Sequence, residues 1–165
     1  MVGWQFQNFT LHRIAALPGG WSPGQEGVVF VEQTPAPIVI LTAADTDVQT
    51  LAIAAKSLPP DCPNLRVTNL LNLQQELTID TYTEQVLAHA EVIVLRLLGG
   101  RSYWSYGLEV CKLATGHPSH QKLIVLPGDD QFDPELASHS NVPLSVVDRL
   151  WRYFLNGGVE NAIAA

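Results

Sequence analysis

The sequence contains few cysteines and few basic residues, and each shortage excludes a class of protein. Its 165 residues include two cysteines, Cys62 and Cys111, which are too few for a disulfide scaffold and have no C-x-x-C spacing. We therefore expect two free thiols in a reducing compartment. Nine lysines and arginines stand against 16 aspartates and glutamates, for a formal net charge of −7. Such an acidic chain is a poor match to a phosphate backbone or an anionic membrane surface, so neither is an expected partner.

Long hydrophobic runs and nucleotide-binding motifs are also missing. No stretch reaches the ~18 consecutive apolar residues of a membrane-spanning helix, and residues 1–10 lack the features of a signal peptide, so we expect a cytoplasmic protein. The fingerprints G-x-G-x-x-G and G-x-x-x-x-G-K-[ST] are absent. No catalytic residue and no metal site is predicted. The hydrophobic share of 47% is nevertheless that of an ordinary globular protein.

Strand-like runs alternate with helix-like segments along most of the chain, which indicates an α/β fold. We expect strands over 38–42, 65–69, 92–97 and 122–126, and helices over about 45–57, 78–90, 103–115 and 143–155, with one or two helical turns over 132–139. Asp45 or Thr46 is expected to cap the first helix, and Thr78 or Asp80 to open the second. Strands that are apolar at nearly every position are typical of parallel sheets covered on both faces.

These patterns predict one domain over residues 1–165 with a mainly parallel, doubly wound sheet of the flavodoxin or Rossmann type. The expected strand order is flavodoxin-like. Residues 11–17 and 28–31 are additionally predicted to form an N-terminal strand or hairpin, whose place in the sheet is open. The residues after Gly158 resemble the start of a further helix that is too short to be stable alone. We therefore expect an excised N-terminal fragment of a much longer chain.

Polar and glycine residues follow the predicted strands at their carboxyl ends, where open α/β sheets bind ligands. The candidate ligand-binding residues are Asp45, Thr46, Asn69, Arg96, Gly99, Gly100, Ser102, Asp129 and Asp130. The same residues fit a purely structural interpretation, in which Asp45 caps a helix and the two aspartates form a turn. Both interpretations stay open at this point.

The run from Arg96 to Tyr106 is chemically the most unusual part of the chain. Arg96 interrupts an apolar strand, so we expect either a buried ion pair, with Asp129 or Asp130 as the acid, or a contact to an anionic ligand. The glycines are expected to adopt positive φ or to allow close backbone approach. The aromatic residues at positions 103, 104 and 106, namely Tyr103, Trp104 and Tyr106, could stack on a flat ligand but more often belong to a core or an interface.

Several blocks, taken in order, carry a resemblance to a known family. They are residues 13–20, 38–45, 96–107, 126–130 and 150–154 followed by Gly157-Gly158. Together they are similar to the amino-terminal segment of the large subunit of aerobic cobaltochelatase. The block Arg96-Leu-Leu-Gly-Gly-Arg-Ser-Tyr-Trp-Ser-Tyr-Gly107 is the most specific. The magnesium chelatase large subunit, which acts in chlorophyll biosynthesis, is a more distant match, because a more aliphatic run is expected there.

The resemblance implies a role in cobalamin (vitamin B12) biosynthesis. Members of this family act as ligases that insert cobalt into a corrin-type tetrapyrrole, hydrogenobyrinic acid a,c-diamide, while AAA+ partner subunits hydrolyse ATP. Cobalt is then a substrate, and no cofactor is expected in this fragment. The implied partners are the remainder of the large subunit, the ATPase subunits and the tetrapyrrole. No catalytic residue is carried over to this segment, which alone is expected to be inactive.

Three roles for the segment remain open at this stage. It could be a rigid lobe that covers the macrocycle or docks the ATPase subunits. It could be a free-standing flavodoxin-like module for a nucleotide or flavin. It could also be an interaction domain whose aromatic run packs on the rest of the chain.

Overall fold

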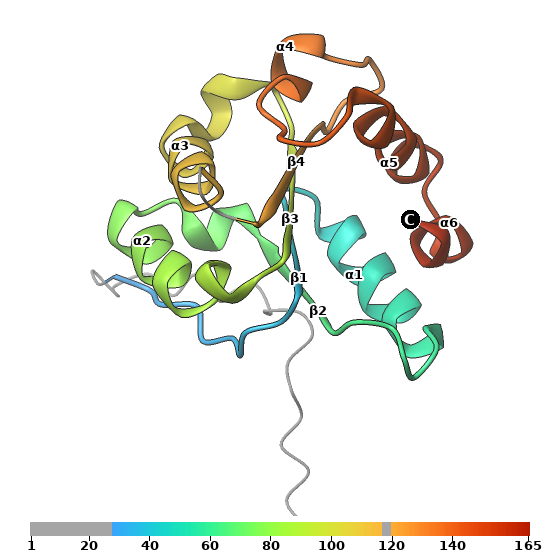
Figure 1. Cartoon of the computed structure of the whole chain (residues 1–165), viewed down its shortest axis with the longest axis horizontal. Coiled ribbons are helices and arrows are strands. Elements are labelled where there is room, and N and C mark those ends of the chain that lie inside the picture. Colours follow the sequence, from blue (N-terminus) through green and yellow to red (C-terminus); the bar gives the residue numbers. More distant parts are fainter. Residues whose placement is uncertain (1–27, 117–119) are drawn as a thin grey trace, which may run out of the picture.

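A computed structural model of the chain describes residues 28–116 and 120–165, which fold around one parallel sheet (Figure 1). The strands are β1 (Ile38–Thr42), β2 (Leu65–Asn69), β3 (Val92–Leu97) and β4 (Lys122–Pro127). Their order is β2-β1-β3-β4, and every neighbouring pair is parallel. The predicted α/β class is therefore confirmed, and the order is that of the first four strands of a flavodoxin-like sheet.

The helices occur where the apolar patterns placed them, with differences at their ends. They are α1 (Asp45–Ala54), α2 (Glu76–Gln85), α3 (Ser105–Ala114), α4 (Pro134–Ala137), α5 (Leu144–Asn156) and α6 (Val159–Ala164). Short 3₁₀ helices extend or precede them: η1 (Ala55–Ser57), η2 (Leu70–Leu73), η3 (Leu87–His89) and η4 (Arg101–Trp104). No helix in residues 28–116 or 120–165 is long and apolar enough to cross a membrane.

Alternate side chains of each strand enter two separate cores, one on each face of the sheet. Leu41 of β1 and Leu95 of β3 face α2 and α3 and are fully buried there. Ile40 and Val94 face the opposite way, against α1 and α5. Figure 1 shows the same arrangement, with α2 and α3 on one side of the strands and α1, α5 and α6 on the other. This period of two explains why the strands are apolar at nearly every position.

Residues 28–31 do not form the predicted strand. Residues 28–36 run without regular secondary structure and are held by side chains of the sheet and of α2. The Thr78 hydroxyl donates to the Val29 carbonyl at 2.9 Å, and Arg66 Nε donates to the Thr34 carbonyl at 2.9 Å. Side chains thus donate hydrogen bonds to backbone carbonyls that a neighbouring strand would otherwise have bonded. The hairpin partner proposed over 11–17 lies outside the described residues.

The first helix begins at Asp45 as predicted, but its predicted capping residue and the predicted start of the second helix were wrong. The N-cap of α1 is Ala44, not Asp45 or Thr46, because the Ala44 carbonyl accepts the first helical bond and no side chain caps the helix. Helix α2 begins at Glu76, not at Thr78 or Asp80. Its early start places Thr78 on the buried face, where its hydroxyl binds the Val29 carbonyl instead of a helix end.

Candidate functional site

Three polar residues lie side by side on neighbouring strands at the carboxyl edge of the sheet. Thr42 at the end of β1 pairs in register with Asn69 of β2 on one side and with Arg96 of β3 on the other. The three residues are between 0% and 9% exposed. The strand order makes β1 and β3 the point at which the chain changes direction across the sheet, where ligands bind in such folds. The sequence thus placed Asn69 and Arg96 correctly at one edge.

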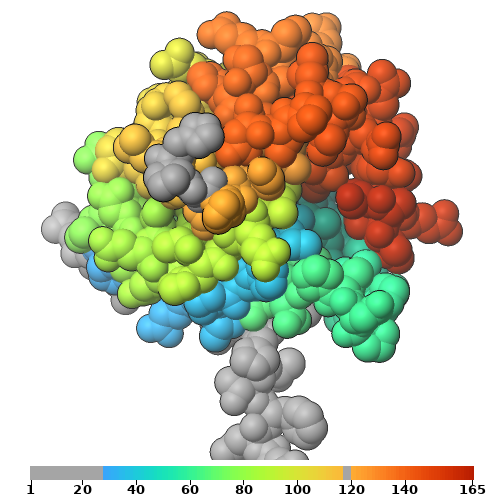
Figure 2. Space-filling model, in the orientation of Figure 1, coloured from blue at the N-terminus to red at the C-terminus, as the bar shows by residue number. Residues whose placement is uncertain are grey.

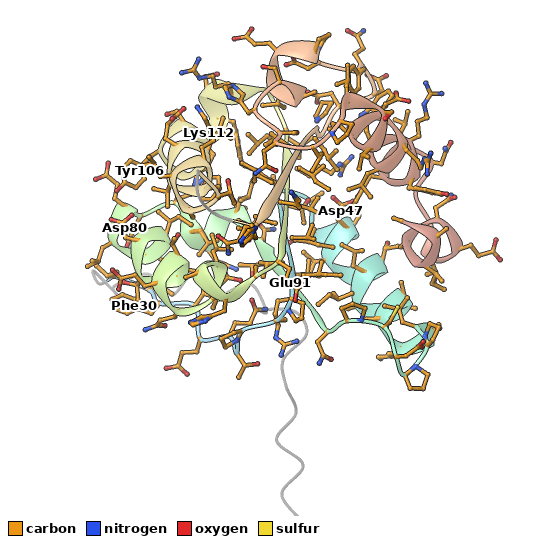
Figure 3. All side chains as sticks on the ribbon, in the orientation of Figure 1. Phe30, Asp47, Asp80, Glu91, Tyr106 and Lys112 are labelled. Atoms are coloured by element: carbon orange, nitrogen blue, oxygen red, sulfur yellow. The ribbon has the colours of Figure 1, made fainter. Side chains whose placement is uncertain are left out.

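Arg96 forms a buried ion pair, but its partner is Asp47 and not Asp129 or Asp130. Its Nη1 lies 2.5 Å from Asp47 Oδ2, and the two side chains are 11% and 13% exposed. Its Nη2 donates to the Gly128 carbonyl at 2.9 Å. Arg96 lies two residues after Val94 on β3 and so shares its face of the sheet, which the first turn of α1 covers. Asp47 of that turn lies on the α1 side of the strands (Figure 3). The helix that follows β1, and not the loop that follows β4, therefore supplies the carboxylate.

Further contacts fix this pair in place. The Thr42 hydroxyl donates to Asp47 Oδ2 at 2.6 Å, so the same oxygen accepts two bonds. The Arg96 guanidinium lies 5.6 Å from the centre of the Phe154 ring, which gives a cation–π contact to α5. Arg96 Nε is buried and has no hydrogen-bond acceptor within the described part of the chain. The pair therefore connects three elements, β1, β3 and α1, with α5 packed over it.

Asn69 and Asp45 form a second polar contact at this edge. The Asn69 amide donates to Asp45 Oδ1 at 2.6 Å, while its side-chain oxygen accepts from the Leu71 N–H at 2.9 Å and caps η2. Both ends of the amide are thus used within the protein. Asp45 and Asn69 were both predicted at this edge of the sheet, and the structure joins them by a hydrogen bond.

The glycine loop after β3 lies at a separate hollow. Gly99 and Gly100 have φ of +75° and +77°, the first of the two roles expected for them, and the Gly99 N–H faces Asp129 Oδ2 at 3.4 Å. The hollow has a volume of about 450 Å³, and its lining includes Gly99, Gly100, Ser102, Asp133 and Glu135. Asp130 is exposed and is not part of this lining.

A smaller cavity of about 250 Å³ lies between α1 and the C-terminal helices. Its lining includes Thr46, Asp47 and Arg96 together with Phe154 of α5 and Ala162 of α6. Eight of the nine predicted residues therefore separate into an ion-pair region with Thr46 and Arg96, an Asp45–Asn69 contact, and the glycine loop with Asp129, and Asp130 belongs to none of these groups. Ligand binding at any of them stays a prediction.

The aromatic run divides between core and surface. Trp104 was expected in a core or an interface, and it lies in the core: it is only 6% exposed and its Nε1 donates to the Leu73 carbonyl at 3.3 Å. The 3₁₀ turn of η4 rotates the indole inward, toward the core of α2 and α3. Tyr103 and Tyr106 are 44% and 42% exposed. The Tyr106 hydroxyl donates to both oxygens of Asp80, and this hydrogen bond raises the pKa of the tyrosine.

Sequence reasoning missed the polar network on the α2 face of β2. Tyr82 donates to Gln33 Oε1 at 2.6 Å, and the Thr68 hydroxyl bonds the same oxygen at 3.0 Å. Burial raises the pKa of Tyr82 to about 12. Arg66 lies beside this network and binds Thr34. A usable signal was present, because Arg66 and Thr68 alternate with apolar residues along β2 and so share one face.

The described residues contain no group of three histidine, cysteine, aspartate or glutamate side chains that could hold a metal ion. The polar groups at the sheet edge instead bind one another. Arg96 with Asp47, and Asn69 with Asp45, join the ends of β3 and β2 to the first turn of α1. The sheet edge is therefore held together by its own polar contacts, and two hollows lie beside it.

The known proteins that this chain resembles in sequence and in structure are all cobaltochelatase subunits. The chain is 43% identical over 152 residues to aerobic cobaltochelatase subunit CobN of Pseudomonas aeruginosa, and 40% identical over 153 residues to CobN of a Sinorhizobium species. Each match covers 92% of this chain, which spans only 12% of the relative's length. Among solved structures, the catalytic subunit of cobaltochelatase from Mycobacterium tuberculosis matches with a TM-score of 0.60 and 27% identity, over 76% of this chain and 9% of that one. No model of a known protein family matches.

Proposed function

We propose that this chain, which is 43% and 40% identical to two aerobic cobaltochelatase large subunits over 92% of its length, belongs to that family and forms an α/β lobe of such a subunit. In this role the lobe supports the insertion of cobalt into hydrogenobyrinic acid a,c-diamide, a step of cobalamin biosynthesis, and supplies no catalytic group of its own. Cobalt is the substrate metal, and AAA+ partner subunits hydrolyse the ATP. The observation that carries the proposal is the 43% identity across 92% of the chain.

The geometry of the sheet edge favours a supporting role over a catalytic one. The charged and amide groups that sequence reasoning proposed for a ligand are joined in pairs, as Arg96 is to Asp47 and Asn69 is to Asp45. Groups that bind each other hold loops in fixed positions, which suits a lobe that must present a rigid surface. The three compared relatives are all cobaltochelatase subunits, which favours cobalt over magnesium as the metal.

A chimeric subunit tests the proposal. In the Pseudomonas aeruginosa relative, the segment that matches this chain is either replaced by it or deleted. Each form is combined with the ATPase subunits, ATP, cobalt and hydrogenobyrinic acid a,c-diamide, and cobalt incorporation is followed by absorbance. We expect insertion by the chimera, loss of insertion by the deletion form, and none by this chain with the ATPase subunits alone.

Two results would contradict the proposal. Full insertion by the deletion form would show that the lobe is dispensable, and insertion by the isolated chain would show that it carries catalysis. A parallel reaction with magnesium in place of cobalt tests the alternative metal. Purified chain that carries a nucleotide or flavin in one-to-one ratio would instead support a free-standing ligand-binding module.

A further inference from the structure

Several large apolar side chains are exposed on the side of the molecule formed by α2, η4 and α3. Six of them form what we call the α2–α3 apolar surface: Val29, Phe30, Leu71, Leu77, Tyr103 and Tyr106. Each is between 42% and 55% exposed. Single exposed apolar residues are ordinary, whereas a group of them on adjoining elements marks a contact site.

Hydrogen bonds tie the segments that carry these residues to one another. The Thr78 hydroxyl holds the Val29 carbonyl against the start of α2, next to Leu77. Trp104 Nε1 holds η4 against the Leu73 carbonyl of η2. Phe30, Asp80 and Tyr106 lie along the same side of the molecule (Figure 3). The space-filling view likewise shows residues 28–36, α2 and α3 as adjoining surface (Figure 2).

Tyr106 is fixed at this surface before any partner arrives. Its hydroxyl bonds both oxygens of the Asp80 carboxylate, at 3.1 and 3.0 Å, although its ring is 42% exposed. An exposed side chain normally samples several rotamers, and ordering it on binding costs free energy. A tyrosine already held in one position avoids that cost, and tyrosine is among the residues enriched at the energetic centres of interfaces.

The charge beside the apolar residues is negative. Helix α2 carries Glu76, Asp80 and Glu84 and has no lysine or arginine, while Arg101 of η4 is the basic residue nearest to the two exposed tyrosines in sequence. A partner that places lysine or arginine at the rim of the contact would complement this surface, and like charges would oppose it.

We infer that the α2–α3 apolar surface packs against the remainder of the large subunit, on a segment with apolar side chains flanked by lysine or arginine. This inference rests on the proposed function. The chain spans 12% of its curated relatives and 9% of the solved subunit, so most of such a subunit lies outside this lobe. The lobe must therefore contact a much larger body, and this is the side on which described apolar residues of four elements meet.

Binding of the isolated chain to the truncated Pseudomonas aeruginosa subunit tests this inference without any chemistry. The test variant is Leu77→Ser with Tyr106→Ser, and the control is Ile53→Ser on α1. Ile53 is 52% exposed and Leu77 55%, but Ile53 lies on the other face of the sheet. We expect the wild type and the control to bind alike, and the double variant to bind at least about tenfold more weakly.

Hydrogen exchange gives a second readout in the chimeric full-length subunit. Amides of η2, η4 and the start of α2 should exchange more slowly there than in the isolated chain. Circular dichroism and urea unfolding confirm that each variant is folded. Loss of cobalt insertion with binding intact would contradict the proposed function alone, and equal binding by the double variant would overturn this inference alone.

Other occupants of the surface are distinguishable outcomes that would also overturn the inference. A second copy of the chain would appear as a dimer in sedimentation equilibrium that the double variant abolishes. An ATPase subunit would bind the isolated chain directly. If residues 1–27 covered the surface, their removal would increase exchange in the isolated chain.

Discussion

Replacement of Arg96 by methionine tests whether the buried ion pair holds the sheet edge together. The substitution keeps much of the side-chain volume but leaves the Asp47 carboxylate, 13% exposed, without its cation. Removal of one partner from a buried pair costs about 3–5 kcal/mol, because the remaining charge stays desolvated. The Thr42 hydroxyl still donates to the carboxylate, which places our expectation at the lower end of that range.

The free energy of unfolding should rise again toward the wild-type value when the Asp47 charge is also removed. Apolar groups that replace both members of a buried pair are often neutral or stabilising, since no charge is left to desolvate. We therefore expect the double variant Arg96→Met/Asp47→Leu to recover most of the stability that Arg96→Met loses. This pattern separates an electrostatic effect from a simple loss of packing against Phe154.

Urea unfolding and thermal unfolding, each followed by tryptophan fluorescence, measure both effects. For a chain of this length, each kcal/mol shifts the Tm by roughly 2–4 °C, so Arg96→Met should lower it by at least about 6 °C. The exposed pair Arg152–Asp148, at 66% and 39% exposed, provides the control, and Arg152→Met should leave the urea midpoint within experimental scatter. The reasoning would be refuted if Arg96→Met unfolded at the wild-type urea midpoint, or if the double variant were less stable than Arg96→Met.

Two further predictions concern the core of α3. Burial raises the pKa of the Cys111 thiol from 9.0 to about 12, so a thiol reagent at pH 8 should label exposed Cys62 alone until the protein unfolds. The associated stability is fully present below pH 9 and declines toward pH 12, and Cys111→Ala should flatten that decline in urea titrations. Gly107→Ala would normally favour a helix, but its Cβ would overlap the buried Trp104 ring. We expect a loss of about 1–3 kcal/mol, and a raised Tm would contradict this.

The sequence determined the secondary structure of the sheet almost completely. The strand β2 was predicted with its observed bounds, and the alternation of apolar runs and helices predicted a mainly parallel sheet. The positive φ of Gly99 and Gly100 was one of the two roles predicted for these glycines. These properties are local, because an apolar run, a turn residue or a glycine determines the backbone conformation of its own short segment.

Predictions that depended on a neighbouring element were less reliable. Residues 28–31 have the composition of a strand, but the Thr78 hydroxyl occupies the Val29 carbonyl. Trp104 and Tyr103 belong to one aromatic run that was expected in a core or an interface, and the turn of η4 places Trp104 in the core while Tyr103 stays exposed. In both cases the local pattern was compatible with two environments, and packing selected one.

The partner of Arg96 was decided only by the tertiary structure. The sequence indicated that an arginine in an apolar strand needs a carboxylate, and it offered several aspartates at the same edge of the sheet. The choice depends on which face of β3 the side chain occupies and which helix covers that face. Arg96 points toward α1, and its Nη1 lies 2.5 Å from Oδ2 of Asp47 in the first turn of that helix. Asp129 follows β4 instead, and its carboxylate lies beside the Gly99 N–H of the loop after β3. A side chain reaches only the groups on its own face, and that geometry exists only once helices and sheet have packed.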